Sequence, residues 1–258
     1  MSKVGIIIPT IFERPEYLFE AIESIRTAGD AYILLSSPDN PEMVSRYIQH
    51  VDEHVLERPD GCLASKINDA LNKLPPDCVF IGWLSDDDLL TPKSIQRAVS
   101  ALQKNPEFAL VYGSCDYIDP AGQKIGRNPS GNWAKGLMHF GPFLIPQPGS
   151  LWRRDKFEQV GGLDTRYGLA FDHDLFIRLN KEFGSVFIPE TQACFRWHPG
   201  SLSVKNRRKS VKEASMIRRS NYRGIARVVL IPWESVVRIA TRGAGQLLSI
   251  RIQRRSKK

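Results

Sequence analysis

The chain has 258 residues, of which 42% are hydrophobic and 25% are charged, a composition typical of a globular domain rather than a disordered or fibrous chain. Its four cysteines are far apart and form no CxxC pair, which argues against a zinc module and predicts a reducing compartment. No apolar run approaches the roughly 20 residues of a membrane span and no segment resembles a signal peptide, so we expect a cytoplasmic protein.

Strands and helices are predicted to alternate through the first 115 residues. Short apolar runs predict strands, and apolar residues that recur every three or four positions predict helices between them. Such alternation implies an α/β fold with a doubly wound parallel sheet. We expect strands at 4–9, 31–36, 54–57, 79–84 and 108–114, and helices at 15–28, 41–50, 63–74 and 92–104.

The pattern changes after residue 115. A Pro-Ala-Gly turn within residues 116–125 separates two short strands, and residues 126–149 form a loop-rich interval of the kind that often serves as a binding surface. A helix at 170–179 is predicted to hold two aspartates in its first turn, as the helix dipole favours. A pair of strands at 186–189 and 194–197 is expected to follow it.

Three consecutive aspartates, residues 86–88, follow the predicted strand at 79–84. We expect Thr91 to be the N-cap and Pro92 the first residue of the next helix. A loop between a strand and a helix lies at the carboxyl edge of the sheet, where open α/β folds bind ligands. Adjacent carboxylates repel one another, and a divalent cation such as Mg²⁺ or Mn²⁺ relieves the repulsion. A solvated acidic turn is the alternative interpretation.

Charge is distributed unevenly along the chain. Residues 199–258 contain 16 Lys or Arg and two Glu, a net charge of +14, which leaves −6 for residues 1–198. A strongly basic segment beside an acidic body indicates an appendage with a polyanionic partner, either membrane lipid or nucleic acid.

Five motifs in this order and spacing resemble those of the family 2 glycosyltransferases of the GT-A fold, over about residues 3–204. Two of them depart from the family pattern, because Ser85 stands at the first position of the DxD-type motif and Phe171 replaces a family Glu. The motifs are Ile8-Pro9-Thr10 with Arg14-Pro15, Leu84-Ser85-Asp86-Asp87-Asp88, Gly161-Gly162-Leu163-Asp164, Asp172-His173-Asp174-Leu175 and Arg196-Trp197-His198-Pro199-Gly200-Ser201.

The resemblance implies a GT-A fold, a Rossmann-like doubly wound mixed sheet, followed by a basic helical appendage. Residues 1–204 would be the catalytic domain, with a nucleotide-binding half at 1–115 and an acceptor-binding half at 116–204, and residues 205–258 would be a basic amphipathic tail. The implied activity is inverting transfer of a sugar from a nucleoside-diphosphate sugar to an acceptor hydroxyl, without a covalent enzyme intermediate.

The resemblance also assigns roles to residues. Mn²⁺ or Mg²⁺ would be held by Asp87, Asp88 and His198. The acceptor side would include Trp152 and Arg153, with Trp133 as a further candidate, and core packing or surface exposure is the alternative for these three. The nucleotide sugar would contact Pro9, Thr10, Asp39, Lys66 and Asp86.

Asp172 is the expected base that takes the proton from the acceptor hydroxyl. The alternative for Asp172 is helix capping. A packed or hydrogen-bonded histidine is the alternative for His198, and an exposed helix lysine is the alternative for Lys66.

The tail is predicted to form helices at 205–222 and 231–252, and Gly243 and Gly245 weaken the second as one continuous helix. Basic residues with apolar ones such as Trp233 suit an anionic membrane surface, so we expect peripheral binding at the inner face of the plasma membrane and a glycan or lipid-linked acceptor. A tail packed on the catalytic domain is the alternative.

Two other function classes fit less well. A sugar nucleotidyltransferase is expected to carry a Gly-rich phosphate loop after the first strand, and residues 10–14 do not provide one. A non-catalytic basic binding protein would contact nucleic acid through the tail. No recognised nucleic-acid motif is present and the basic residues are confined to the tail, so nucleic acid is an unlikely partner.

Overall fold

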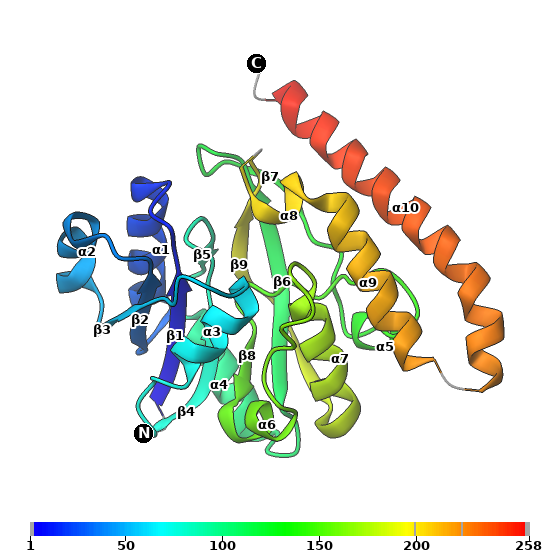
Figure 1. Ribbon diagram of the computed structural model, residues 1–258, viewed down its shortest axis with the longest axis horizontal. Coiled ribbons are helices and arrows are strands. Elements are labelled where there is room, and N and C mark those ends of the chain that lie inside the picture. Colours follow the sequence, from blue (N-terminus) through cyan, green and yellow to red (C-terminus); the bar gives the residue numbers. More distant parts are fainter. Residues whose placement is uncertain (1–2, 199, 223, 256–258) are drawn as a thin grey trace.

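The structure, a computed structural model, describes residues 3–198, 200–222 and 224–255, and these residues form one nine-stranded mixed sheet flanked by helices (Figure 1). The sheet order is β3-β2-β1-β4-β8-β6-β9-β5, with β7 paired to β6. The strands are β1 (Lys3–Pro9), β2 (Tyr32–Ser37), β3 (Glu53–Leu56), β4 (Cys78–Trp83), β5 (Leu89–Leu90), β6 (Leu110–Ile118), β7 (Lys124–Arg127), β8 (Leu151–Arg153) and β9 (Ser185–Arg196).

Strand direction divides the sheet into two parts. β1, β2, β3 and β4 are parallel and form the expected Rossmann-like half. β8 then runs antiparallel between β4 and β6, and β9 runs parallel to β6. Because β1 to β4 are parallel, their carboxyl ends meet at one edge, and the loops that follow them meet there too.

Helices cover both faces of the sheet, as in a doubly wound fold. One face packs mainly against α1 and α4, and the other against α3, α6, α7 and α9. The helices are α1 (Pro15–Ala28), α2 (Pro41–Tyr47), α3 (Leu63–Leu71), α4 (Ser94–Lys104), α5 (Ala134–Leu137), α6 (Arg154–Gln159), α7 (Phe171–Phe183), α8 (Leu202–Lys205), α9 (Arg207–Asn221) and α10 (Ile225–Arg255), with a 3-10 turn η1 (Ile48–His50).

The sequence pattern accounts for these elements. Residues 4–8 of β1 are all buried, because the sheet is covered on both faces. The strand is therefore a continuous apolar run in the sequence. In α1, the buried Leu18, Ala21, Ile22 and Ile25 recur at helical spacing and face the sheet.

Three predicted elements differ from the structure. Helix α4 begins at Ser94 rather than Pro92, because Lys93 adopts a left-handed conformation (φ 63°) and the Thr91 hydroxyl donates to the Thr191 carbonyl instead of capping. The strand pair expected near the end of the body is the single strand β9, and shifts in its register with β6 absorb the irregularity. Helix α10 begins at Ile225 rather than at residue 231, and it continues through Gly243, which was expected to weaken it.

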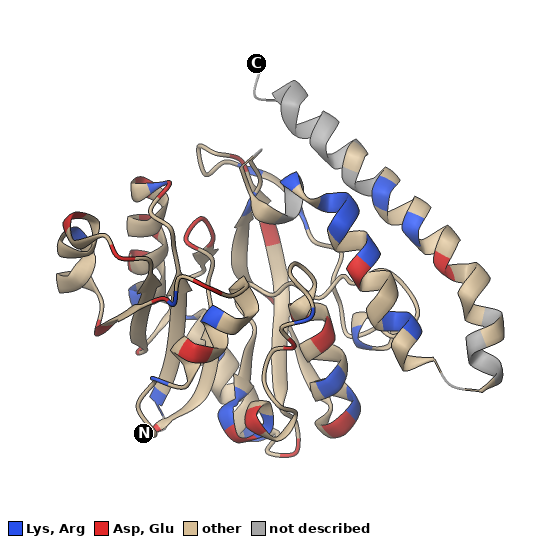
Figure 2. Ribbon diagram, in the orientation of Figure 1, with Lys and Arg blue, Asp and Glu red and all other residues tan. Residues whose placement is uncertain are grey.

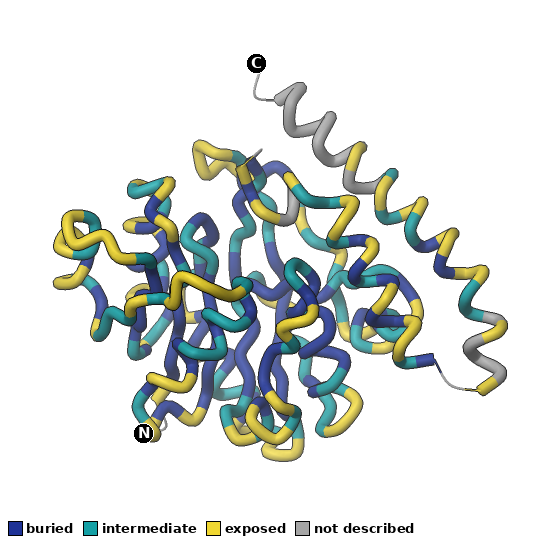
Figure 3. Tube along the Cα trace, in the orientation of Figure 1, coloured by how far each residue is buried: buried dark blue, intermediate teal, exposed yellow. Residues whose placement is uncertain are grey.

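The two long C-terminal helices have different environments. Figure 2 shows Lys and Arg along α9 and the described part of α10, and Figure 3 shows that α9 buries one face while most of the described α10 is exposed. Ile217 of α9 is completely buried in the core shared with α7. The domain boundary expected at residue 204 stays a prediction, and the packing of α9 argues against it.

A buried ion pair joins α10 to α9. Arg218 donates to both carboxylate oxygens of Glu234 at 2.7 and 2.8 Å, and the Tyr222 hydroxyl donates to the same carboxylate at 2.6 Å. Within the described residues, no helix is both long enough and apolar enough to cross a bilayer. Leu247, Leu248, Ile250 and Arg251 belong to the amphipathic pattern of the predicted tail, and their side chains lie outside the described part of the chain.

Candidate active site

The acidic loop, residues 84–88, leaves the carboxyl end of β4 and turns sharply. The Leu84 amide donates to the Ile7 carbonyl of β1 at 2.9 Å, and the Asp88 amide donates to the Ser85 carbonyl at 3.2 Å. These bonds fix the loop at the edge where β1 and β4 end. The three aspartates then point to different partners, so each has its own environment.

Asp86 is bound to the loop that follows β1. The Thr10 hydroxyl donates to Asp86 Oδ2 at 2.6 Å and accepts the Phe12 amide at 3.0 Å. Burial raises the pKa of Asp86 to about 6, an effect that the Thr10 hydrogen bond opposes and the charge of Asp87 supports. Phe12 has a positive φ of 59°, an uncommon conformation that often occurs at functional sites.

Asp87 pairs with a histidine from the last motif. His198 Nε2 lies 2.7 Å from Asp87 Oδ2, and both side chains are largely buried. Arg14, after β1, donates to the Gly200 carbonyl at 3.1 Å and so joins the first and last motifs. Pro199, which lies between His198 and Gly200 in the sequence, is outside the described residues. In the part of the chain that the structure describes, no group of three or more His, Cys, Asp or Glu side chains is arranged to hold a metal.

Asp88 has a different partner from Asp87. Its side chain is 1% exposed, and its Oδ1 accepts the backbone amide of Arg196 at 2.9 Å. Burial, with the neighbouring charge of Asp87, raises the pKa of Asp88 well above its usual value. This buried carboxyl holds β9 against the acidic loop, and the expected role of Asp88 as a metal ligand stays a prediction.

Arg196 is the residue of the last motif whose role the sequence does not reveal. Its guanidinium is buried and donates to the carbonyls of Asp87 and Pro120, each at 3.0 Å. It also forms an ion pair with Glu20 of α1 and lies over the ring of Tyr17, 4.1 Å from the centroid. A single side chain thus fixes the acidic loop, α1 and the β6–β7 hairpin.

The predicted nucleotide side contains a second ion pair. Lys66 Nζ of α3 lies 2.8 Å from Glu57 Oε2, and Ser36 Oγ donates to Glu57 Oε1 at 3.1 Å. The Glu57 side chain is 4% exposed, so Lys66 is the partner of a buried carboxylate rather than an exposed helix lysine. Sequence reasoning missed Glu57, although its position just after β3 was a signal. Asp39 lies exposed after β2, and Pro9 ends β1 beside Ser36.

Asp172 lies in the first turn of α7. Its Oδ1 accepts the His173 amide at 2.8 Å, and its side chain is only partly exposed. Burial raises the pKa of Asp172 to about 6, with a smaller contribution from the charge of Glu213. The neighbouring Phe171 packs against Trp83, with ring centroids 5.7 Å apart, and Trp83 is the last residue of β4. Asp172 is therefore brought toward the edge that carries the acidic loop.

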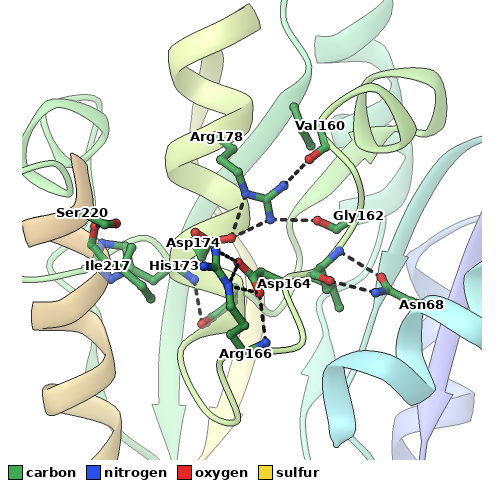
Figure 4. A network of polar contacts seen from close by, with 12 residues as sticks. Asn68, Val160, Gly162, Asp164, Arg166, His173, Asp174, Arg178, Ile217 and Ser220 are labelled. Atoms are coloured by element: carbon green, nitrogen blue, oxygen red, sulfur yellow. Dashed lines mark hydrogen bonds and ion pairs between the residues drawn. The ribbon is translucent and has the colours of Figure 1, made fainter. Parts of the chain in front are cut away.

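The two glycines before α7 form a turn that α7 itself secures. Gly161 and Gly162 have φ values of +82° and +70°, which residues with side chains rarely adopt. Arg178 of α7 donates to the carbonyls of Val160 and Gly162 at 2.7 and 2.8 Å and pairs with Asp174 (Figure 4). This motif therefore sets the position of the helix that bears Asp172.

The same turn is tied to α3. Asn68 donates to the Leu163 carbonyl and accepts the Leu163 amide, both at 2.9 Å (Figure 4). Asp164 pairs with the exposed Arg166, and this pair holds the pKa of Asp164 below its usual value. The motif thus connects α3 to α7 without offering a free carboxylate.

The structure corrects the expected acceptor residues. Trp152 is completely buried and packs against Trp83, so it cannot touch a ligand. Arg153 donates to the carbonyls of Phe108 and Leu102. Its backbone pairs with Phe80 in the middle of β4, and its guanidinium lies at the end of α4 and the start of β6 rather than at the acidic loop. Trp133, which is 55% exposed, stays a candidate for acceptor contact.

Comparison with known proteins gives relatives of partial length. No model of a known protein family matches the chain. The O-antigen biosynthesis protein RfbC of Myxococcus xanthus is 30% identical over 111 residues, or 42% of this chain and 8% of RfbC. Succinoglycan biosynthesis protein ExoW of Rhizobium meliloti is 23% identical over 40% of this chain and 35% of ExoW. Chondroitin synthase of Pasteurella multocida is 24% identical over 79% of this chain and 21% of the synthase. The chain thus spans about a third or less of these relatives.

Solved structures share the fold across most of the chain. The mannosyltransferase PcManGT from Pyrobaculum calidifontis, in complex with GDP-Man and Mn²⁺, matches with a TM-score of 0.62 at 14% identity, over 95% of this chain and 75% of that one. S. aureus TarS 1–349, in complex with UDP-GlcNAc, matches with a TM-score of 0.60 at 11% identity, over 83% of this chain and 66% of that one.

Proposed function

We propose that this chain, a GT-A-type glycosyltransferase by its fold and its sequence relationships, transfers a sugar from a nucleoside-diphosphate sugar to an acceptor hydroxyl in polysaccharide or lipid-linked glycan synthesis. The observation that carries the proposal is the approach of two different carboxylates to one sheet edge. Asp87 is paired with His198, and Asp172 follows Phe171, which packs on the end of β4. These two sites suit opposite sides of a reacting sugar carbon.

The residues on the diphosphate side fit a divalent cation. A carboxylate oxygen of Asp87 and an imidazole nitrogen of His198 lie 2.7 Å apart, and oxygens of the diphosphate and of water suit the remaining ligand positions of Mn²⁺ or Mg²⁺. A bound cation neutralises the charge that develops on the departing diphosphate. Thr10 and Asp86 would contact the nucleoside, with the Glu57–Lys66 pair beside them.

Asp172 would act as the base on the acceptor side. The acceptor oxygen forms a bond to the anomeric carbon while the bond from that carbon to the diphosphate oxygen breaks, and the acceptor proton moves to Asp172. This single displacement inverts the anomeric configuration. A carboxyl with a pKa of about 6 is ionised at neutral pH and is a stronger base than an exposed aspartate.

The first test is calorimetry with UDP and GDP, each with and without Mn²⁺. We expect Mn²⁺ to strengthen binding of one nucleotide, and Asp87→Ala to weaken the metal-dependent binding by about tenfold or more, because a ligand shared with the diphosphate is lost. Asp30→Ala, which removes an exposed aspartate between α1 and β2, is the matched control. Full metal-dependent affinity in a folded Asp87→Ala protein would contradict the assignment.

The second part of the proposal concerns the acceptor. The exposed face of α10 carries Val228, Val236 and Ile239, which are 74%, 52% and 72% exposed, beside Arg238 and Arg242. Apolar and basic side chains on one helix face suit an anionic lipid surface, which would bring the enzyme to a lipid-linked acceptor at the inner face of the plasma membrane.

Sedimentation with vesicles tests this second part. We expect the protein to bind vesicles containing anionic lipid better than neutral ones, with salt weakening the binding. Reversal of charge at Arg238 and Arg242 should reduce binding mainly at low salt, whereas Ile239→Ser should reduce it at all salt concentrations. An absence of binding by the full chain at low salt would refute the membrane proposal.

A further inference from the structure

A carboxylate from the C-terminal helix α9 contacts the start of α7. Glu213 Oε2 accepts the backbone amides of Leu169 and Ala170 at 2.8 and 3.0 Å. Glu213 is 8% exposed, although it belongs to the most basic part of the chain. A carboxylate that accepts two amides makes charge-assisted hydrogen bonds, which are stronger than neutral ones.

The contact supplies what α7 does not provide for itself. Ala170 is the N-cap residue of α7, and no side chain caps the helix from that position. A negative charge beside a helix N-terminus is favourable because the first amides are unpaired and the helix dipole is positive there. Glu213 therefore brings a negative charge to the N-terminus of α7 from a different element and binds the two amides that precede Phe171, the first residue of the helix.

We infer that Glu213 is a positioning residue for the proposed base Asp172, so that α9 is part of the catalytic apparatus rather than part of a separable tail. The inference rests on the proposed function. Glu213 fixes residues 169–170 from one side, and the packing of Phe171 on Trp83 fixes the next residue from the other. The three residues that precede Asp172 are thus each held by a contact with another element.

Alternative tasks for Glu213 are less consistent with its surroundings. Glu213 is buried, so it does not serve as a solvated charge that balances the neighbouring lysines. The buried pair that links α9 to α10 is Arg218 with Glu234, so Glu213 is not needed for that connection. Within the described residues, the side chain of Glu213 accepts hydrogen bonds from the amides of Leu169 and Ala170, just before Asp172.

The test compares three substitutions at one position. Glu213→Gln keeps an oxygen that accepts both amides, so we expect kcat within about twofold of the wild type. Glu213→Ala removes the acceptor, so kcat should fall roughly tenfold or more while the donor KM changes less than about twofold, because only the base side is displaced. Lys212→Ala, an exposed change on the same helix, is the control and should leave both constants unchanged.

Hydrogen exchange on the same proteins gives a readout independent of turnover. The amides of Leu169 and Ala170 should lose protection by about tenfold or more in Glu213→Ala and keep it in Glu213→Gln. Glu213→Asp, with a shorter side chain, should show intermediate loss in both measurements and replaces the alanine variant if that variant does not fold.

The results distinguish a failure of the positioning role of Glu213 from a failure of the proposed base Asp172. If Glu213→Ala or Glu213→Asp loses protection at these amides but keeps the kcat of Lys212→Ala, the contact is structural only and the positioning role is overturned. Full turnover by Asp172→Asn would instead overturn the proposed base, while the exchange data would still report whether Glu213 holds the start of α7.

Discussion

The acidic loop and the start of α7 each present a carboxylate to the same region, but they hold it in different ways. Asp87 is surrounded by polar contacts from distant segments, including His198 and the guanidinium of Arg196 on its carbonyl. Asp172 follows a phenylalanine packed on Trp83, and within the described residues its side chain accepts the local amide of His173. Identical side chains therefore have different surroundings, and these fit the two roles that we propose: a cation ligand for Asp87 and, with its raised pKa, a base for Asp172.

The largest expected effect separates the two carboxylates kinetically. Asp172→Asn keeps the shape of the side chain, so the donor should bind with nearly normal affinity, whereas turnover should fall by at least about a hundredfold because a positioned base is lost. Steady-state kinetics together with calorimetry on the same preparation measure both quantities. Near-normal turnover would favour a capping role for Asp172.

A substitution at Arg196 should disturb the acidic loop, which carries Asp87, and leave the start of α7 unchanged. Arg196→Ala leaves the carbonyls of Asp87 and Pro120 without a buried donor and should lower the free energy of unfolding by about 3 kcal/mol. The melting temperature should fall on the order of 10 °C. Calorimetric melting against Arg97→Ala, which removes a less buried arginine of α4, provides the comparison. Equal losses for both variants would show that Arg196 has no special role.

The pH dependence of turnover should report on the α7 side. The base must be ionised to accept a proton, so kcat should be constant above the pKa of Asp172, about 6, and should fall roughly tenfold for each pH unit below it. The weak residual activity of Asp172→Asn should lack this dependence. A profile that stays flat down to pH 5 in the wild type would argue against Asp172 as the base.

The smallest effect is expected from the hydroxyl that binds Asp86. Thr10→Val keeps the volume of the side chain but removes the donor to Asp86 and the acceptor for the Phe12 amide. We expect the affinity for the nucleotide sugar to fall about five- to tenfold, consistent with about 1 kcal/mol for one hydrogen bond. At saturating nucleotide sugar, kcat should stay within about twofold. Thr10→Ser is the control that keeps the hydroxyl.

Much of the fold followed from the sequence because burial imposes regular patterns. The run Ile6-Ile7-Ile8 and the run before the aspartates could only be buried strands between helices, and the comparisons confirm the GT-A fold that the motifs suggested. The detailed role of the acidic loop was harder to predict, since a sequence does not show that Asp88 bonds to Arg196 across 108 positions.

The errors have physical causes. For Trp152 the sequence left acceptor contact and core packing equally open, and the sheet register and complete burial decide for the core. The basic charge of residues 199–258 suggested an appendage for a polyanionic partner, with packing on the catalytic domain as the alternative, and α9 has a buried face that includes Ile217 and Glu213. Net charge reports the exposed face of a helix and says little about what the opposite face contacts.

The position of Arg196 also has a consequence for the thermodynamics of binding. Its guanidinium connects the acidic loop, Glu20 of α1 and the hairpin carbonyl of Pro120 before any donor arrives. The conformational entropy of ordering this loop is therefore lost during folding and not during association. A preorganised loop of this kind leaves more of the contact energy available as affinity, so donor binding should show little of the unfavourable entropy that accompanies ordering of a loop.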